Sequence, residues 1–155
     1  MSELNINIHG ESQNATKFVA KARNFELIID EPEDLGGTNE GANPVEFLLS
    51  AYAGCLNVVG HIVAKEIGFE IEKININISG NLNPDRLFGK SYVDRAGFKS
   101  IKVQLEPESN ATPQQLENWL REVENRCPIN DNLKNETDIT VNCIKVFDTS
   151  SSRLN

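Results

Sequence analysis

The chain has 155 residues, 39% of them apolar and 25% charged, which is enough for one soluble domain with a hydrophobic core. Its net charge of −8, with no run of Lys and Arg, argues against binding to nucleic acid or to an anionic membrane surface. No secretory signal is expected, because a basic region followed by an apolar stretch is missing from the N-terminus. Three cysteines do not suit a secreted disulfide framework and favour a cytoplasmic protein with redox-active thiols.

Alternating polar and apolar residues predict strands in the first part of the chain. Residues 3–9 place three apolar side chains on one face, and GESQN then reads as a turn. Residues 16–21 and 24–30 are two further strand candidates. The next segment, DEPEDLGGTNEGAN, is rich in Gly and Asp, so it is expected to be a surface loop near the mouth of any pocket.

A long helix follows, with Asn43 as its N-cap, Pro44 as its first residue and Gly68 ending it. Residues 47–64 carry no formal charge and reach the lower limit of membrane-spanning length. Polar residues and glycines within this segment favour instead the central helix of a soluble core. Almost every face of the helix is apolar, which suggests that a second copy of the chain covers part of it in a homodimer.

The second half of the chain alternates strands and helices. Residues 69–81 and 99–106 predict strands joined by an irregular connection. Thr112, Pro113 and Gln115 form the start of a capped helix that Pro128 interrupts.

Residues 139–147 predict a last strand in which Cys143 faces the core. Residues 148–155 look like a disordered tail. The order βββ–α–ββ–α–β indicates a single α+β domain over residues 1–147, with antiparallel sheet packed on helices.

Two cysteines in unlike settings are the main candidates for chemistry. Cys55 lies within the long apolar helix, and Cys127 lies next to the break at Pro128. Each has a plain structural interpretation, as a small core residue and as a helix-end residue. If Cys127 caps a helix that starts at Pro128, the helix dipole lowers its pKa; if it ends the preceding helix, the dipole opposes ionisation. The proline and the neighbouring Arg126 favour the first alternative.

Other kinds of site have little support. The chain contains no CxxC or HExxH motif, and His9 and His61 lack ligand spacing, so no metal is expected. There is no nucleophile-elbow sequence for Ser/His/Asp catalysis, and GGTNEG lacks the Lys-Ser/Thr of a phosphate-binding loop.

Three segments in order, DEPEDLGGTNEGANPVEFLLSAYAGC, RAGF and NRCPINDNL, resemble the OsmC/Ohr family over about residues 18–147. The resemblance implies an intertwined homodimer with the long helices in the centre and antiparallel sheets around them. It also implies a thiol peroxidase for organic hydroperoxides, with Cys55 as the peroxidatic and Cys127 as the resolving cysteine. A small apolar hydroperoxide and a dithiol reductant would be its partners, and no metal or flavin is needed.

The chain departs from the characterised peroxidases of that family at two points. Their helix start has a carboxylate directly after the proline; here Val45 holds that position and Glu46, the candidate for the carboxylate's role, comes one residue later. They also use an arginine from a loop between early strands, which GESQN lacks, leaving Arg23 and Arg95 as substitutes. The alternative function is therefore a non-catalytic OsmC-like module that binds a small ligand or senses redox state.

Overall fold

The computed structural model describes residues 3–146, so the disordered tail predicted for residues 148–155 lies outside the described part of the chain. An antiparallel sheet comes first, in the order β1–β2–β3, followed by a long helix, an antiparallel strand pair and two helices. The elements are β1 (His9–Ser12), β2 (Phe18–Ala22), β3 (Phe25–Ile29), the 3-10 turn η1 (Glu33–Leu35), α1 (Pro44–Ile67), β4 (Ile71–Asn81), β5 (Ser100–Ser109), α2 (Pro113–Arg126) and α3 (Pro128–Lys134).

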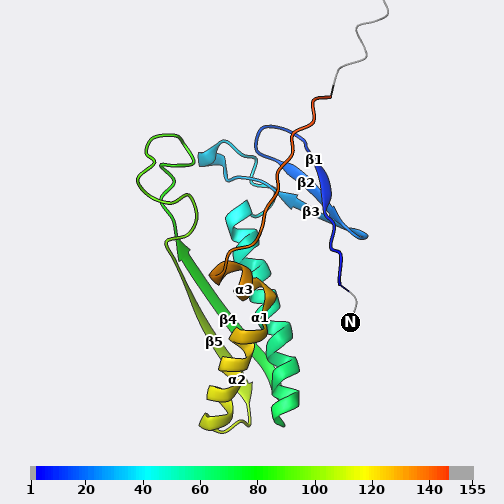
Figure 1. Cartoon of the computed structure of the whole chain (residues 1–155), viewed down its shortest axis with the longest axis vertical. Helices are drawn as coiled ribbons and strands as arrows, with labels where there is room; N and C mark the ends of the chain where they lie inside the picture. The colour runs from blue at the N-terminus through cyan, green and yellow to red at the C-terminus, as the bar shows by residue number, and fades with distance from the viewer. Residues whose placement is uncertain (1–2, 147–155) are drawn as a thin grey trace, which may run out of the picture.

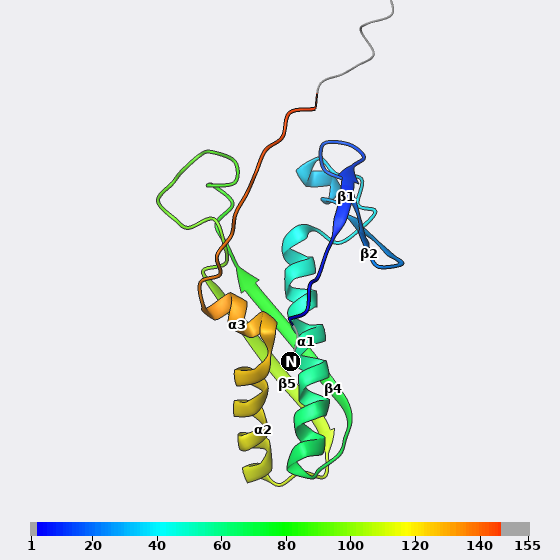
Figure 2. The same cartoon turned by 45° about the vertical axis from the view of Figure 1, so that its right-hand side comes forward.

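The helix α1 organises the rest of the fold. It packs against β4, α2 and α3, while the β4–β5 pair runs along it (Figures 1 and 2). The three-stranded sheet lies near the N-terminal end of α1, away from α2 in both views. The buried core lies between α1, α2 and the turn before β4, and consists of Tyr52, Leu56, Val63, Ala64, Phe69, Trp119, Val123 and Cys127.

Both predicted helix starts are confirmed, and each is a reciprocal capping box. At α1 the Asn43 side chain accepts from the backbone N–H of Glu46, and the Glu46 carboxylate accepts from the N–H of Asn43. Thr112 and Gln115 do the same for α2. Gly68 ends α1 with φ of 93°, a conformation that favours glycine. These local signals fix the ends of the two helices.

Two predicted strands are wrong for the single chain. Within residues 3–9 only His9 belongs to a strand, and residues 139–146 form none. A strand needs a neighbouring backbone to bond with, and among the described residues the two sheets contain β1 to β5 without residues 3–8 or 139–146. Cys143 is exposed rather than core-facing for the same reason. The apolar side chains left exposed are Leu4, Ile6, Ile8, Ile139, Val141, Ile144 and Val146.

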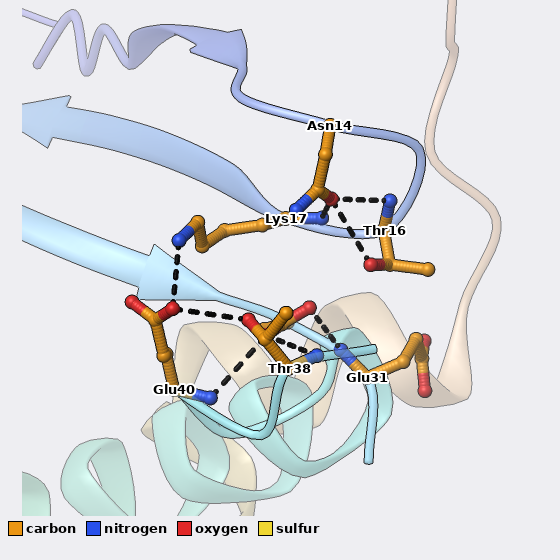
Figure 3. A network of polar contacts seen from close by, with 7 residues as sticks. Asn14, Thr16, Lys17, Glu31, Thr38 and Glu40 are labelled. Carbon is orange, nitrogen blue, oxygen red and sulfur yellow. Dashed lines mark hydrogen bonds and ion pairs between the residues drawn. The ribbon is translucent and has the colours of Figure 1, made fainter. Parts of the chain in front are cut away.

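A buried carboxylate fixes the loop that leads into α1. Asp30 accepts hydrogen bonds from the Thr38 hydroxyl at 2.6 Å and from the backbone N–H groups of Glu31, Thr38 and Glu40 (Figure 3). The Glu40 carboxylate in turn pairs with Lys17, which precedes β2, at 2.9 Å. The network therefore ties the loop to the open end of the β2–β3 hairpin, where β2 begins and β3 ends.

We expect Asp30→Asn to lower the thermal midpoint at pH 7 by roughly 5 °C, because the neutral amide is a weaker acceptor. The Thr38 hydroxyl, with the N–H groups of Glu40, Glu31 and Thr38, holds the pKa of Asp30 far below its usual 3.8 despite its burial. A lowered folded-state pKa stabilises the fold above about pH 4, and this contribution is lost as the pH falls further. The difference in thermal midpoint between Asp30→Asn and the wild type should therefore become smaller below about pH 4. Thermal melts followed by circular dichroism at several pH values measure it.

The exposed Asp34 in the same loop provides the control, and Asp34→Asn should have the same thermal midpoint as the wild type. Equal midpoints for Asp30→Asn and Asp34→Asn at pH 7 would show that the network contributes nothing to stability.

Candidate functional site

The fold brings Cys55 and Cys127 into contact. The Cys127 Sγ donates a hydrogen bond to the Cys55 Sγ across 2.8 Å, and both thiols are free. Cys55 comes from the middle of α1, and Cys127 is the single residue between α2 and α3. The contact results from the packing of α2 and α3 on α1, which joins positions far apart in the sequence.

Cys127 combines both alternatives considered for it. Its backbone N–H bonds to the Val123 carbonyl and ends α2, while its sulfur accepts from the Asn130 N–H and caps α3. The expectation of a lowered pKa is wrong, because burial raises the pKa of the Cys127 thiol and the neighbouring Cys55 adds to the rise. The N–H groups of α3 oppose this shift without reversing it. Cys127 is 0% exposed and keeps its proton, which suits its role as donor to Cys55.

A chain of two hydrogen bonds between polar groups lies beside Cys127. The Tyr52 hydroxyl donates to Asn130 Oδ1 at 2.6 Å, and Asn130 Nδ2 donates to the Glu124 carbonyl at 2.7 Å. Tyr52 and Asn130 are both buried. Burial raises the pKa of Tyr52, so its hydroxyl keeps the proton that it donates. Sequence reasoning missed both residues; the one signal available was a tyrosine three positions before Cys55, on nearly the same helix face.

Cys55 lies at an open, mostly apolar hollow of about 530 Å³. It is lined by Gly54, Cys55, Val58, Val59, Ile62, Arg126 and Pro128. Arg126 was expected to add positive potential beside Cys127. It forms instead a bidentate ion pair with Glu66, in which Nη2 of the arginine lies 3.1 Å from Oε1 of the glutamate. Its charge is therefore largely compensated, and the pair joins the end of α2 to α1.

A larger groove of about 740 Å³ opens between α1, α2, α3 and β5. Leu48 and Leu56 of α1, Leu116 and Trp119 of α2, and Leu105 of β5 give it an apolar wall. The polar chain of Tyr52, Asn130 and Glu124 also borders the groove, whereas neither sulfur does.

The other residues that the sequence suggested for the site, Glu46, Arg23 and Arg95, interact with other parts of the protein. Glu46 is exposed, and its carboxylate serves the capping box of α1. Arg23 stacks on Phe25 at the tip of the β2–β3 hairpin, and Arg95 borders the larger groove. In the described part of the chain, neither sulfur accepts a hydrogen bond from an arginine, and no group of three His, Cys, Asp or Glu could hold a metal ion.

Comparison with known proteins agrees with this architecture. The family model described as OsmC-like protein matches residues 37–142, within the span of about 18–147 suggested by the sequence motifs. Because the match covers more than half of the chain, the protein belongs to the OsmC-like family. A search of the curated proteins found no match.

Solved structures share the fold at low sequence identity. An OsmC-like protein from Mycoplasma pneumoniae has 21% identity and a TM-score of 0.74, with 86% of this chain and 89% of that chain covered. An organic hydroperoxide resistance protein OsmC from Legionella pneumophila, a predicted redox protein, has 15% identity and a TM-score of 0.65, with 86% of this chain and 92% of that chain covered. The organic hydroperoxide resistance protein OhrB of Bacillus subtilis has 17% identity and a TM-score of 0.59, with 87% of this chain and 94% of that chain covered.

The family fold also bears on the apolar helix. By length and composition α1 is the one helix among the described residues that could cross a membrane. Its inner side carries Tyr52, Leu56, Gly60, Val63 and Ala64, which are buried against β4 and α2. It is the core helix of an OsmC-like α+β fold, as the sequence pattern predicts.

Proposed function

We propose that this protein is a thiol-dependent peroxidase that reduces organic hydroperoxides through Cys55 and Cys127. The observation that carries the proposal is the 2.8 Å contact between the two sulfurs, one at an open hollow and the other buried. Two relatives of the same fold are named organic hydroperoxide resistance proteins, which supports the same chemistry.

The reaction needs only the two thiols and an external reductant. The Cys55 thiolate attacks one peroxide oxygen, the O–O bond breaks, and the products are a sulfenic acid on Cys55 and an alcohol once the leaving oxygen takes a proton. The Cys127 thiol then attacks the sulfenic sulfur, which forms a disulfide and releases water. A dithiol reduces the disulfide by exchange and restores both thiols.

The apolar lining of the hollow at Cys55 favours an alkyl or aryl hydroperoxide over hydrogen peroxide. Val58, Val59 and Ile62 offer no hydrogen-bond partner to a small polar oxidant, whereas they can cover a hydrocarbon group. Glu46 remains a candidate for assisting the reaction only if its carboxylate leaves the capping box, so the proposal does not depend on it.

The proposal includes a cytoplasmic homodimer. Val58 and Ile62 are exposed beside Cys55, and Gly54 leaves open space where another backbone could approach. Apolar side chains are exposed in two segments that belong to neither sheet among the described residues: Leu4, Ile6 and Ile8, and Ile139, Val141, Ile144 and Val146. A second copy that covers these surfaces would also close the hollow around Cys55.

Turnover with a defined substrate tests the function. Purified protein with excess dithiothreitol should consume many equivalents of cumene hydroperoxide, at a kcat/KM at least about tenfold above that for hydrogen peroxide, since burial of the cumyl group supplies a few kcal/mol. Cys143→Ser, which removes the exposed third thiol, should leave this rate unchanged. Consumption that stops at one equivalent would contradict a peroxidase.

That outcome would instead support the second candidate, a non-catalytic module that binds a small ligand or senses redox state. Two observations favour it: neither sulfur accepts a hydrogen bond from an arginine among the described residues, and neither sulfur borders the larger apolar groove. A sensor would form the disulfide once and hold it, whereas an enzyme would return to the dithiol and continue.

A further inference from the structure

We infer that Tyr52 and Asn130 are positioning residues that hold the sulfur of Cys127 against Cys55 and so set how readily the two thiols form a disulfide. The inference deepens the proposed function, since it concerns the thiol pair on which that function rests. It assigns a role to two buried polar side chains that the peroxide chemistry itself does not use.

Asn130 is buried and directly hydrogen-bonded to the sulfur of Cys127. It is 4% exposed and lies in the first turn of α3, three residues after Cys127. Its backbone N–H donates to the Cys127 sulfur at 3.5 Å. Any movement of Asn130 therefore moves the N–H group from which the Cys127 sulfur accepts.

Two hydrogen bonds hold the side chain of Asn130 in place. Its Oδ1 accepts from the Tyr52 hydroxyl of α1, and its Nδ2 donates to the Glu124 carbonyl of α2. One side chain thus joins the start of α3 to both neighbouring helices. The Glu124 carbonyl lies in the last turn of α2, where helix carbonyls lack intrahelical partners, so the bond also completes that helix end.

Tyr52 and Cys55 come from the same helix. Both lie on α1 three positions apart, one helical turn, so they present neighbouring side chains to α3. The helix that carries one sulfur therefore also carries the hydroxyl that locates the other. Because the bond is buried and each partner is satisfied by it, losing either end leaves an unpaired polar group and loosens the first turn of α3.

Diamide provides a test that does not depend on peroxide. It accepts two electrons and two protons from a pair of thiols and becomes a hydrazine as the sulfur–sulfur bond forms. The Cys55–Cys127 crosslink rate is measured by quenched mass spectrometry, and the thiol–disulfide equilibrium constant by titration with reduced and oxidised glutathione. We expect Tyr52→Phe to lower both by about tenfold, the factor that one lost buried hydrogen bond supplies. Tyr92→Phe, which removes an exposed hydroxyl, is the matched control and should change neither.

Asn130→Ala removes both side-chain bonds and should have a larger effect than Tyr52→Phe. Adding Tyr52→Phe to Asn130→Ala should then slow crosslinking no further, because the two residues act through one bond. Should Asn130→Ala fail to fold, Tyr52→Phe decides alone. A crosslink rate and equilibrium constant for Tyr52→Phe within twofold of Tyr92→Phe would overturn the inference. A wild type that forms the diamide crosslink but does not consume cumene hydroperoxide would contradict the proposed function and leave the positioning role intact.

Discussion

Replacing Cys55 with serine is expected to abolish hydroperoxide reduction, with a loss of about a thousandfold or more, as follows when a reaction loses its nucleophile. A serine hydroxyl stays protonated at neutral pH and cannot accept the peroxide oxygen as a thiolate does. The measurement is consumption of cumene hydroperoxide in excess dithiothreitol. Residual activity within tenfold of the wild type would show that Cys55 is not the attacking group.

Cys127→Ser should separate the first step from the second. The variant should still release one alcohol per chain in a single turnover, since Cys55 is intact. Without a buried thiol in contact with it, the sulfenic acid should then persist and oxidise further to sulfinic acid under excess peroxide, a gain of two oxygens on Cys55 by mass spectrometry. Clean multiple turnover by Cys127→Ser would contradict its role as resolving cysteine.

The largest expected effect on stability belongs to Trp119. Its ring is 2% exposed, and its Nε1 donates to the Gly60 carbonyl of α1 at 2.8 Å. Trp119→Ala should lower the free energy of unfolding by about 3–5 kcal/mol, because it empties the contact between α1 and α2 and removes the buried indole hydrogen bond. Urea denaturation followed by circular dichroism measures this difference.

The neighbouring Leu120 offers a control on the same helix. It is 45% exposed at the wall of the larger groove, so Leu120→Ala should cost less than half as much in the single chain. Equal losses for the two variants would mean that the α1–α2 contact does not centre on Trp119.

The sequence predicted best what depends on short-range signals. The caps at Asn43 and Thr112, the glycine that ends α1, and the alternation that became β4 each depend on residues a few positions apart, so their geometry follows from local chemistry. Pro128 likewise marked the break between α2 and α3 correctly. The order of these elements was sufficient for the α+β class.

What the sequence could not predict depends on partners distant along the chain. The direction of the Cys127 pKa shift follows from burial under α1, which a dipole argument on α3 alone does not contain. The bond between Tyr52 and Asn130 joins two helices and leaves no local pattern. The segments at residues 3–9 and 139–147 have a strand pattern, but pattern alone does not supply a neighbouring backbone.

The most direct test of the central claim is peptide mass spectrometry of protein treated with one equivalent of cumene hydroperoxide and then alkylated. We expect a peptide pair joined through Cys55 and Cys127 to become the main oxidised species, and to disappear after addition of dithiothreitol. If Cys55 and Cys127 are instead both alkylated as free thiols, or if either is found joined to Cys143, the two sulfurs do not act as a peroxide-driven redox pair.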